Sequence, residues 1–206
     1  PRVLGAKEKT AVAALLLCAL GSSFFLLNRL YIAKTAIVPA RGGSLVEGMV
    51  GFPRFLNPVY ADANDVDRNL VQLIFSGLFK YNSKGELVGD LAKDFQIDEQ
   101  GKVFTGHLKE NIQWHDGAPL NADDVVFTIK TTQDPEYKSP LRANWQGVAV
   151  EKLSDTSVRF SLRQPYAPFM ENLTVGILPE HLWRKIPREA AILSDLNSKP
   201  VGSGPY

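Results

Sequence analysis

The strongest constraint in this sequence is an apolar run of 18 uncharged residues, Thr10–Leu27. A helix rises about 1.5 Å per residue, so this run spans about 27 Å, close to the thickness of a bilayer core. Asn28, Arg29 and Tyr31 follow it, where the residues of a membrane interface are expected. The predicted parts of this region are a basic N-terminus at 1–9, a transmembrane anchor at 10–32 and a linker at 33–43.

Two other fates of the apolar run stay open. A signal peptide can be cleaved at small residues, and Val38-Pro39-Ala40 offers them, although it lies well beyond the run. A lipoprotein signal requires a small residue before its cysteine, whereas Leu17 precedes Cys18. Basic residues flank the run on both sides, so charge does not fix its orientation.

Charge is distributed unevenly along the chain. Of 23 basic and 22 acidic residues, five basic and one acidic residue fall within 1–34, which leaves 18 basic and 21 acidic residues for 35–206. This mildly acidic portion argues against nucleic acid as a partner. Because Cys18 is the only cysteine, disulfides and cysteine-ligated zinc are excluded from the portion beyond the apolar run.

The best specified local structure is the stretch Asn111–Lys130. It contains a polar turn with a large aromatic at its start, 114–117, and then a helix that Asn121 can cap through its side-chain oxygen. Asp123 and Asp124 fall in the first helical turn, where the helix dipole favours negative charge. A turn, a cap and an apolar run therefore agree with one another.

This stretch resembles the most recognisable block of the family 5 extracytoplasmic solute-binding proteins of ABC transporters. The matching positions, which we expect to be mainly structural, are Trp114, His115, Asp116, Gly117, Ala122, Asp123, Asp124 and Val125. Other blocks similar to this family occur in order along the chain at Leu56-Asn57-Pro58, Asp155–Leu162, Ile177–Leu182 and Pro200–Tyr206. The last of these lies well inside family members, so the resemblance implies an N-terminal fragment, truncated at its C-terminal end.

The resemblance implies an α/β fold, namely the N-terminal lobe of a two-lobed, type II periplasmic-binding-protein-like fold, preceded by one transmembrane helix. The truncated solute-binding domain is assigned to 44–206. Within it, hydrophobic periodicity and turn signals predict a helix at about 66–79 and strands at 44–50, 103–108, 148–153 and 157–162. The apolar face of the helix is assigned to Val66, Leu70, Leu73, Ile74 and Leu78.

The sequence lacks the usual patterns of catalysis. His107, His115 and His181 fall on separate predicted elements without a second ligand at helical spacing, so no metal site is expected. Neither a nucleophile elbow nor a phosphate-binding loop is present. We therefore expect no enzyme activity and no cofactor.

The function that the resemblance implies is the substrate-binding component of an ABC importer, anchored in the cytoplasmic membrane through 10–32 with its domain on the extracytoplasmic side. It would capture a peptide or similar small solute and deliver it to the permease subunits. Candidate cleft residues are Tyr60, Ala61, Asp62, Trp145, Thr174 and Val175, and Trp145 has core packing as its alternative role. A membrane-tethered peptide sensor or a chaperone-like protein without a transporter is the competing function.

Overall fold

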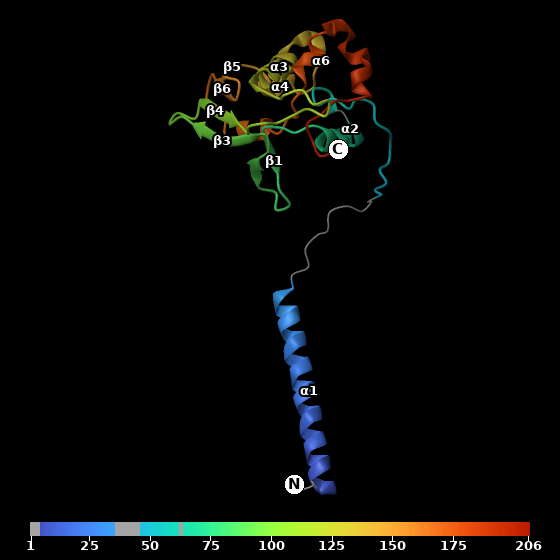
Figure 1. Ribbon diagram of the computed structural model, residues 1–206. Helices are drawn as coiled ribbons and strands as arrows, with labels where there is room; N and C mark the ends of the chain where they lie inside the picture. The colour runs from blue at the N-terminus through green and yellow to red at the C-terminus, as the bar shows by residue number, and fades with distance from the viewer. Residues whose placement is uncertain (1–4, 36–45, 62–63) are drawn as a thin grey trace. The chain divides into compact units, whose positions relative to one another are not determined.

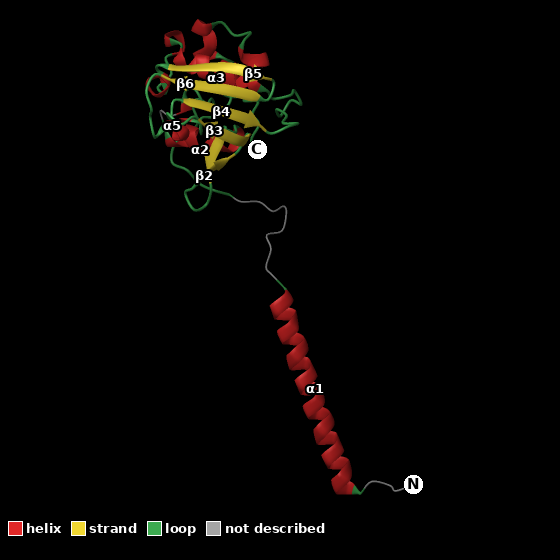
Figure 2. Cartoon of the chain, turned by 90° about the vertical axis from the view of Figure 1, so that its left-hand side faces the viewer, coloured by secondary structure: helices red, strands yellow, loops and turns green. Residues whose placement is uncertain are grey.

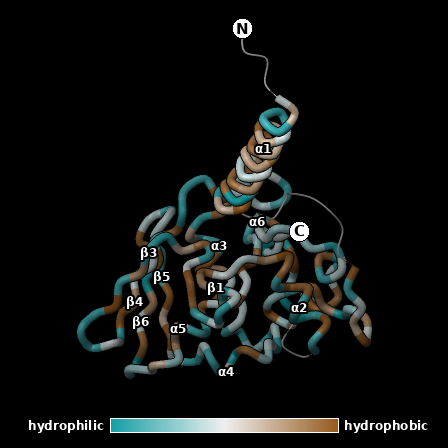
Figure 3. Tube along the Cα trace, turned by 90° about the horizontal axis from the view of Figure 1, so that it is seen from below, coloured by the Kyte–Doolittle hydropathy of each residue, from teal (hydrophilic) through white to brown (hydrophobic). Residues whose placement is uncertain are grey.

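The computed structural model describes residues 5–35, 46–61 and 64–206, which divide into compact units at 1–47 and 48–206. Among its described residues, the first unit contains one helix, α1 (Ala6–Lys34), and no residue of this helix is buried. Apolar residues cover much of this helix (Figure 3). Its 29 residues extend about 44 Å, so α1 is long and apolar enough to cross a membrane, a property that signal sequences share.

The second unit is built on a four-stranded antiparallel sheet with the strand order β3-β4-β6-β5 (Figure 2). Its strands are β3 (Ala92–Ile97), β4 (Val103–Leu108), β5 (Val148–Ser154) and β6 (Ser157–Leu162). Two hairpins supply the strands and meet where β4 pairs with β6. A smaller two-stranded sheet joins β1 (Phe79–Tyr81) to β2 (Leu87–Gly89).

Alternation along the central strands sets the buried face of the sheet. Val158 and Phe160 of β6 are fully buried, whereas Arg159 between them is only partly covered. Gly106 of β4 leaves room for the ring of Phe95, its partner in β3, because a Cβ at this position would lie 2.7 Å from that ring. The sheet therefore presents one apolar face to the rest of the unit.

Helices pack over this sheet (Figure 1). A buried aromatic cluster lies in the core of the unit. Helix α3 (Ala122–Gln133) contacts β5 and β6. Ring centroids in the cluster lie 4.7–6.2 Å apart, and its members are Phe104, Trp145, Phe160 and Phe169. The other helices and 3-10 turns are α2 (Asp65–Ile74), η2 (Pro135–Tyr137), α4 (Arg142–Trp145), α5 (Phe169–Asn172), α6 (Glu180–Trp183), η3 (Arg188–Leu193) and η4 (Asp195–Asn197).

The structure confirms the strands predicted at 103–108, 148–153 and 157–162 and the capped helix after Asn121, and it corrects two other elements. Helix α2 ends at Ile74 instead of continuing to 79, because Phe75 adopts an extended conformation. Its buried apolar residues are Val66 and Val71, whereas Leu73 is 45% exposed. The strand predicted at 44–50 is wrong over its described part, 46–50, which has no strand conformation.

Candidate functional site

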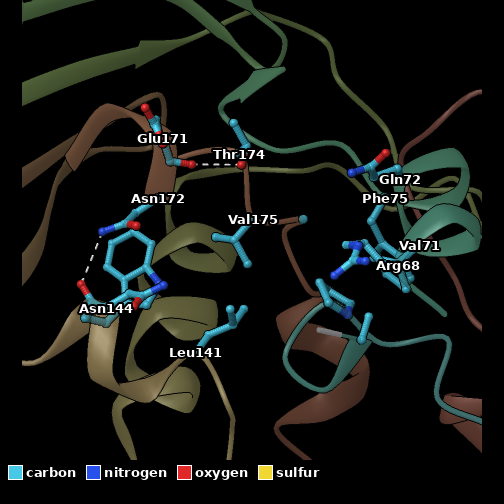
Figure 4. Close-up of a pocket in the computed structure, with 14 residues that line it drawn as sticks. Arg68, Val71, Gln72, Phe75, Leu141, Asn144, Glu171, Asn172, Thr174 and Val175 are labelled. Atoms are coloured by element: carbon cyan, nitrogen blue, oxygen red, sulfur yellow. Dashed lines mark hydrogen bonds between the residues drawn. The ribbon is translucent and has the colours of Figure 1, made fainter. Parts of the chain in front are cut away.

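A cavity of about 210 Å³ lies among four segments that are far apart in the sequence (Figure 4). They are the loop before α2, the α2 helix, the region around α4, and the chain from α5 to β-bridge residue Gly176. Its lining residues are Pro58, Ala61, Arg68, Val71, Gln72, Phe75, Leu141, Asn144, Trp145, Glu171, Asn172, Thr174, Val175 and Gly176. The cavity is therefore a product of tertiary packing and not of one motif.

One wall is a single face of α2 and its C-cap. Arg68, Val71, Gln72 and Phe75 follow the spacing i, i+3, i+4, i+7, which places their side chains on one side of a helix. The N-terminus of the helix is capped, because the side-chain oxygen of Asn64 accepts a hydrogen bond from the backbone amide of Asp67 at 2.9 Å. This wall combines a cation and an amide with two apolar surfaces.

Asp67 also fixes α2 against the preceding loop. Its carboxylate is buried and accepts backbone N–H groups from Arg54 at 2.7 Å and from Phe55 at 3.0 Å. A carboxylate that accepts several N–H bonds holds the donor segment in one conformation. The loop and the helix wall therefore form one connected piece.

The opposite wall is the segment 174–176, which is pressed against the chain that leaves α2. Gly77 and Gly176 form an isolated antiparallel bridge, and the amide of Ile177 donates to the carbonyl oxygen of Ser76 at 3.0 Å. A Cβ on Gly176 would lie 2.7 Å from the Cβ of Phe75, so only glycine permits this approach. This close contact brings residues about a hundred positions apart to the same rim.

Side chains of the rim are polar where they face each other. The hydroxyl of Thr174 donates to the carbonyl oxygen of Glu171 at 2.8 Å, and the side-chain amide of Asn172 donates to the carbonyl oxygen of Asn144 at 3.2 Å (Figure 4). Val175 lies between these groups and the α2 wall in the same view. The rim thus offers both apolar area and hydrogen-bonding groups.

The loop before α2 is held by buried amides. Asn57 is 1% exposed, and its Nδ2 donates to Oδ1 of Asn197 at 3.0 Å while its own Oδ1 accepts the amide of Val59 at 2.9 Å. The carbonyl oxygen of Val59 in turn accepts the hydroxyl of Ser139 at 2.7 Å. These bonds fix the position of Ala61 in the cavity wall.

Trp145 belongs both to the cavity and to the core. It lines the cavity, but it is only 1% exposed, and its ring packs edge-on against Phe169 with centroids 5.8 Å apart. The carbonyl oxygen of Trp145 also accepts the side-chain amide of Gln133 at 2.8 Å. Both roles predicted for this residue are therefore compatible with its position.

The structure brings four of the six predicted cleft residues to this cavity: Ala61, Trp145, Thr174 and Val175. Tyr60 is buried instead and packs against Phe55, and burial raises the pKa of its phenol to about 12, with a smaller contribution from Tyr137. Asp62 lies outside the described residues. Binding itself stays a prediction for all six.

Sequence analysis missed the contribution of α2. Arg68 and Gln72 are polar, so they did not belong to the apolar stripe that the periodicity analysis followed. The sequence does contain a pattern that predicts this face of the helix: Val71 and Phe75 follow Arg68 and Gln72, each three residues later, which is helical spacing. Glu171 and Asn144 had no comparable signal, because their positions depend on how α4 and α5 pack.

The family block around the 114–117 turn lies in a different place, where several segments meet. The carboxylate of Asp124 accepts the amides of Asn121 and Glu180, each at 2.9 Å. Burial raises its pKa, and the two backbone hydrogen bonds oppose this shift. Thr128 continues the connection, because its hydroxyl donates to the carbonyl oxygen of Asp124 and accepts the amide of Leu178.

The turn itself is closed by its own side chains. Asp116 accepts the amide of Ala118 at 3.1 Å and pairs with Nε2 of His181 at 2.8 Å. The hydrogen bond from His181 lowers the pKa of Asp116. Within residues 5–35, 46–61 and 64–206, no three His, Cys, Asp or Glu side chains are grouped to hold a metal.

Comparison with known proteins gives a consistent result. Residues 86–206 match the middle region of the bacterial extracellular solute-binding proteins, family 5. The chain is 31% identical over 177 residues to the oligopeptide-binding protein AppA of Bacillus subtilis, covering 84% of this chain and 32% of that protein. It is 28% identical over 198 residues to the dipeptide-binding protein of Escherichia coli, covering 85% and 37%.

Solved structures agree with the sequence matches. The structure of B. subtilis AppA in complex with a nonapeptide matches with a TM-score of 0.77 and 31% identity, over 82% of this chain and 34% of that one. NikZ of Campylobacter jejuni in complex with Ni(L-His) matches with a TM-score of 0.69 and 32% identity, over 76% and 31%. The mixed α/β architecture is thus that of periplasmic binding proteins, and the chain spans about a third of the length of these relatives.

Proposed function

Because the chain belongs to the family 5 bacterial extracellular solute-binding proteins, which are binding proteins and not enzymes, we propose that it captures a peptide or a similar small solute for an ABC importer. The observation that carries this proposal is the cavity between α2 and the segment 174–176. Ala61, Trp145, Thr174 and Val175 meet there from three separate regions of the chain.

The lining of this cavity suits a peptide. Val71, Phe75 and Val175 offer apolar area to side chains, while Thr174 and the neighbouring amides offer hydrogen bonds to a main chain. Arg68 and Glu171 place opposite charges on the two sides, although Arg68 is also paired with Asp65. The names of the relatives, an oligopeptide-binding and a dipeptide-binding protein, support the same substrate class.

The size of the cavity indicates how binding would work. Its volume of about 210 Å³ is below the 300–1,000 Å³ or so of a typical small-molecule pocket. We therefore assign these residues to one wall of a larger site, which a second lobe would complete by hinge closure over the solute. Most of the contacts would form on closure, and no bond of the solute would be made or broken.

The place of action follows from the family and from α1. Family members are extracellular, and α1 has the length and composition of a membrane span. We propose that α1 anchors the protein in the cytoplasmic membrane, that the solute-binding domain at 44–206 lies outside, and that permease subunits receive the solute. Membrane extraction with carbonate, combined with the intact mass of the protein, distinguishes this anchor from a cleaved signal. An uncleaved chain that stays in the membrane supports the anchor, whereas a shortened chain that is released overturns it.

Binding is tested by thermal unfolding of the full-length protein in detergent, with a dipeptide, a nonapeptide and Ni(L-His) as probes. A ligand that binds only the folded state stabilises it by about 2.7 kcal/mol at 100 times its Kd. The blocking variant Val175→Trp should abolish this rise in Tm. The matched control Leu193→Trp adds the same ring at a position that is 84% exposed and outside the cavity, and it should respond like the wild type.

The outcomes separate the possible readings. A rise with either peptide that Val175→Trp removes supports both the peptide class and the site. A rise with Ni(L-His) alone changes the substrate class. A rise that Val175→Trp leaves intact contradicts the assignment of this cavity.

A further inference from the structure

His115 makes hydrogen bonds that depend on its protonation state. Its Nε2 lies 2.9 Å from the carbonyl oxygen of Gly204, and the backbone amide of Gly202 donates to its Nδ1 at 3.3 Å. A carbonyl only accepts and an amide N–H only donates. The ring must therefore be neutral, with its proton on Nε2, to make both bonds.

These bonds hold the segment 202–206 between the turn and α2. The amide of His115 also donates to the carbonyl oxygen of Gly202 at 2.9 Å. On its other side, the segment donates from the amide of Gly204 to the carbonyl oxygen of Ile74 at 2.8 Å, and from Tyr206 to Leu73 at 3.3 Å. In Figure 1 the C-terminal end accordingly lies beside α2.

We propose that His115 is a proton-sensitive latch that fastens the segment 202–206 and loosens its hold on Gly202 when the imidazole takes up a second proton. Protonation places a hydrogen on Nδ1, which then faces the N–H of Gly202 and no longer accepts from it. Histidine is the side chain that changes charge between about pH 5 and 8. Protonation therefore exchanges the hydrogen bond from Gly202 for a donor–donor contact, while Nε2 still donates to the carbonyl oxygen of Gly204.

The charged groups near the latch include a neighbouring ion pair. Asp116 beside His115 is already paired with His181, the titratable group that α6 presents with Glu180. Lys199 and Tyr206 are the titratable groups on the chain around the latched segment. The end of α2 contributes the uncharged Leu73 and Ile74.

The latch connects to the end of α2 through closely packed backbone, and the amide of Ser76 donates to the hydroxyl of Ser203 at 3.3 Å. Gly202 approaches so closely that a Cβ would lie 1.9 Å from the carbonyl oxygen of Ile74, and a Cβ on Gly204 would lie 2.4 Å from that of Leu73. Two glycines in this short stretch therefore permit a contact that any side chain would prevent. Opening of the latch frees the C-terminal end of α2, the helix that carries Arg68 and Gln72.

Hydrogen exchange of the full-length protein tests this proposal. The amides of Gly204 and Tyr206 report on the latch, and the amide of Phe160 in the central strand β6 reports on global unfolding. Protection factors, corrected for the intrinsic pH dependence of exchange, are compared at about pH 7.5 and about pH 5. We expect the latch amides to lose protection by about tenfold, the equivalent of one hydrogen bond, while the Phe160 amide does not change.

Two variants separate the two histidines. His115→Gln cannot take up a proton, so the pH response of the latch amides should disappear, whereas His181→Gln should retain it. Imidazole ¹⁵N spectra give a second measurement that does not require a variant, because they should report the neutral Nε2–H tautomer of His115 at high pH. Three results would each overturn the proposal. They are protection of the latch amides that does not depend on pH in the wild type, a pH response that persists in His115→Gln, and an Nδ1–H tautomer of His115 at high pH.

Discussion

Replacement of Asp124 by alanine should destabilise the protein by about 3 kcal/mol. In the wild type, the backbone N–H groups of Asn121 and Glu180 each lie 2.9 Å from a carboxylate oxygen of Asp124, and the variant removes this acceptor from both. A buried donor left without a partner costs about 1–3 kcal/mol, and the lower half of this range applies here because the two bonds are partly buried. The sum is reduced because the wild-type protein must desolvate a carboxylate at this site, an effect that is visible in its raised pKa.

The matched control is the neighbouring residue in the same helical turn. Asp123 is 46% exposed, and its partner Lys152, at 2.7 Å, is also paired with Asp155 at 2.6 Å. Such exposed ion pairs contribute about 1 kcal/mol or less, so Asp123→Ala should have a small effect. Asp124→Asn should fall between the two, because its amide keeps one acceptor and removes the buried charge.

Urea unfolding of the full-length protein in a mild detergent measures these differences as shifts in midpoint at constant m. A Tm shift of about 6–12 °C for Asp124→Ala would correspond to the expected loss in a domain of this size. Equal destabilisation by the two alanine variants would refute the reasoning, because it would mean that the capping bonds add nothing beyond surface charge. A loss below about 1 kcal/mol for Asp124→Ala would refute it as well.

Three further changes test other parts of the structure. Gly202→Ala should lower the free energy of unfolding by about 1–3 kcal/mol through overpacking against the end of α2. Its control is Gly48→Ala, whose Cβ would have nothing within 4 Å and which should change that free energy by less than about 0.5 kcal/mol. Chemical denaturation measures both. Hydrogen bonds from the backbone amides of Val103 and its neighbours lower the pKa of Asp98. Asp98 therefore stabilises the fold at a pH above the ordinary pKa of aspartate, and this stabilisation is lost as the pH falls through the lowered pKa of the folded state. Asp98→Asn should remove this component from the pH dependence of unfolding. Trp145→Ala should cost about 3–5 kcal/mol, so a folded control at that residue requires Trp145→Phe.

Sequence patterns predicted those parts of the fold that depend on contacts between residues close together in the chain. The cap at Asn121 was predicted because its acceptor and the first helical amides are only two or three residues apart. Alternation likewise predicted β6, in which Val158 and Phe160 are fully buried. In these elements the period of the pattern and the packing of the chain agree.

The errors have a common physical cause, which is pairing over long distances in the sequence. The apolar residues from Val66 to Leu78 continue a helical period beyond Ile74, but Gly77 pairs with Gly176 and the chain is extended there. A strand also requires a partner, and periodicity at 46–50 says nothing about whether one is present. No pattern within about ten residues contains this information.

The same distinction explains the candidate site. Thr174 and Val175 were predicted through the family resemblance, whereas Arg68 and Gln72 were not, although both pairs line one cavity. The cavity exists because a glycine at 176 lets its segment approach Phe75, and that contact sets the distance between the two walls. The residues most able to alter the shape of the site are therefore those that hold the walls together, and a side chain at 176 should widen the cavity without removing any of the groups proposed to touch a ligand.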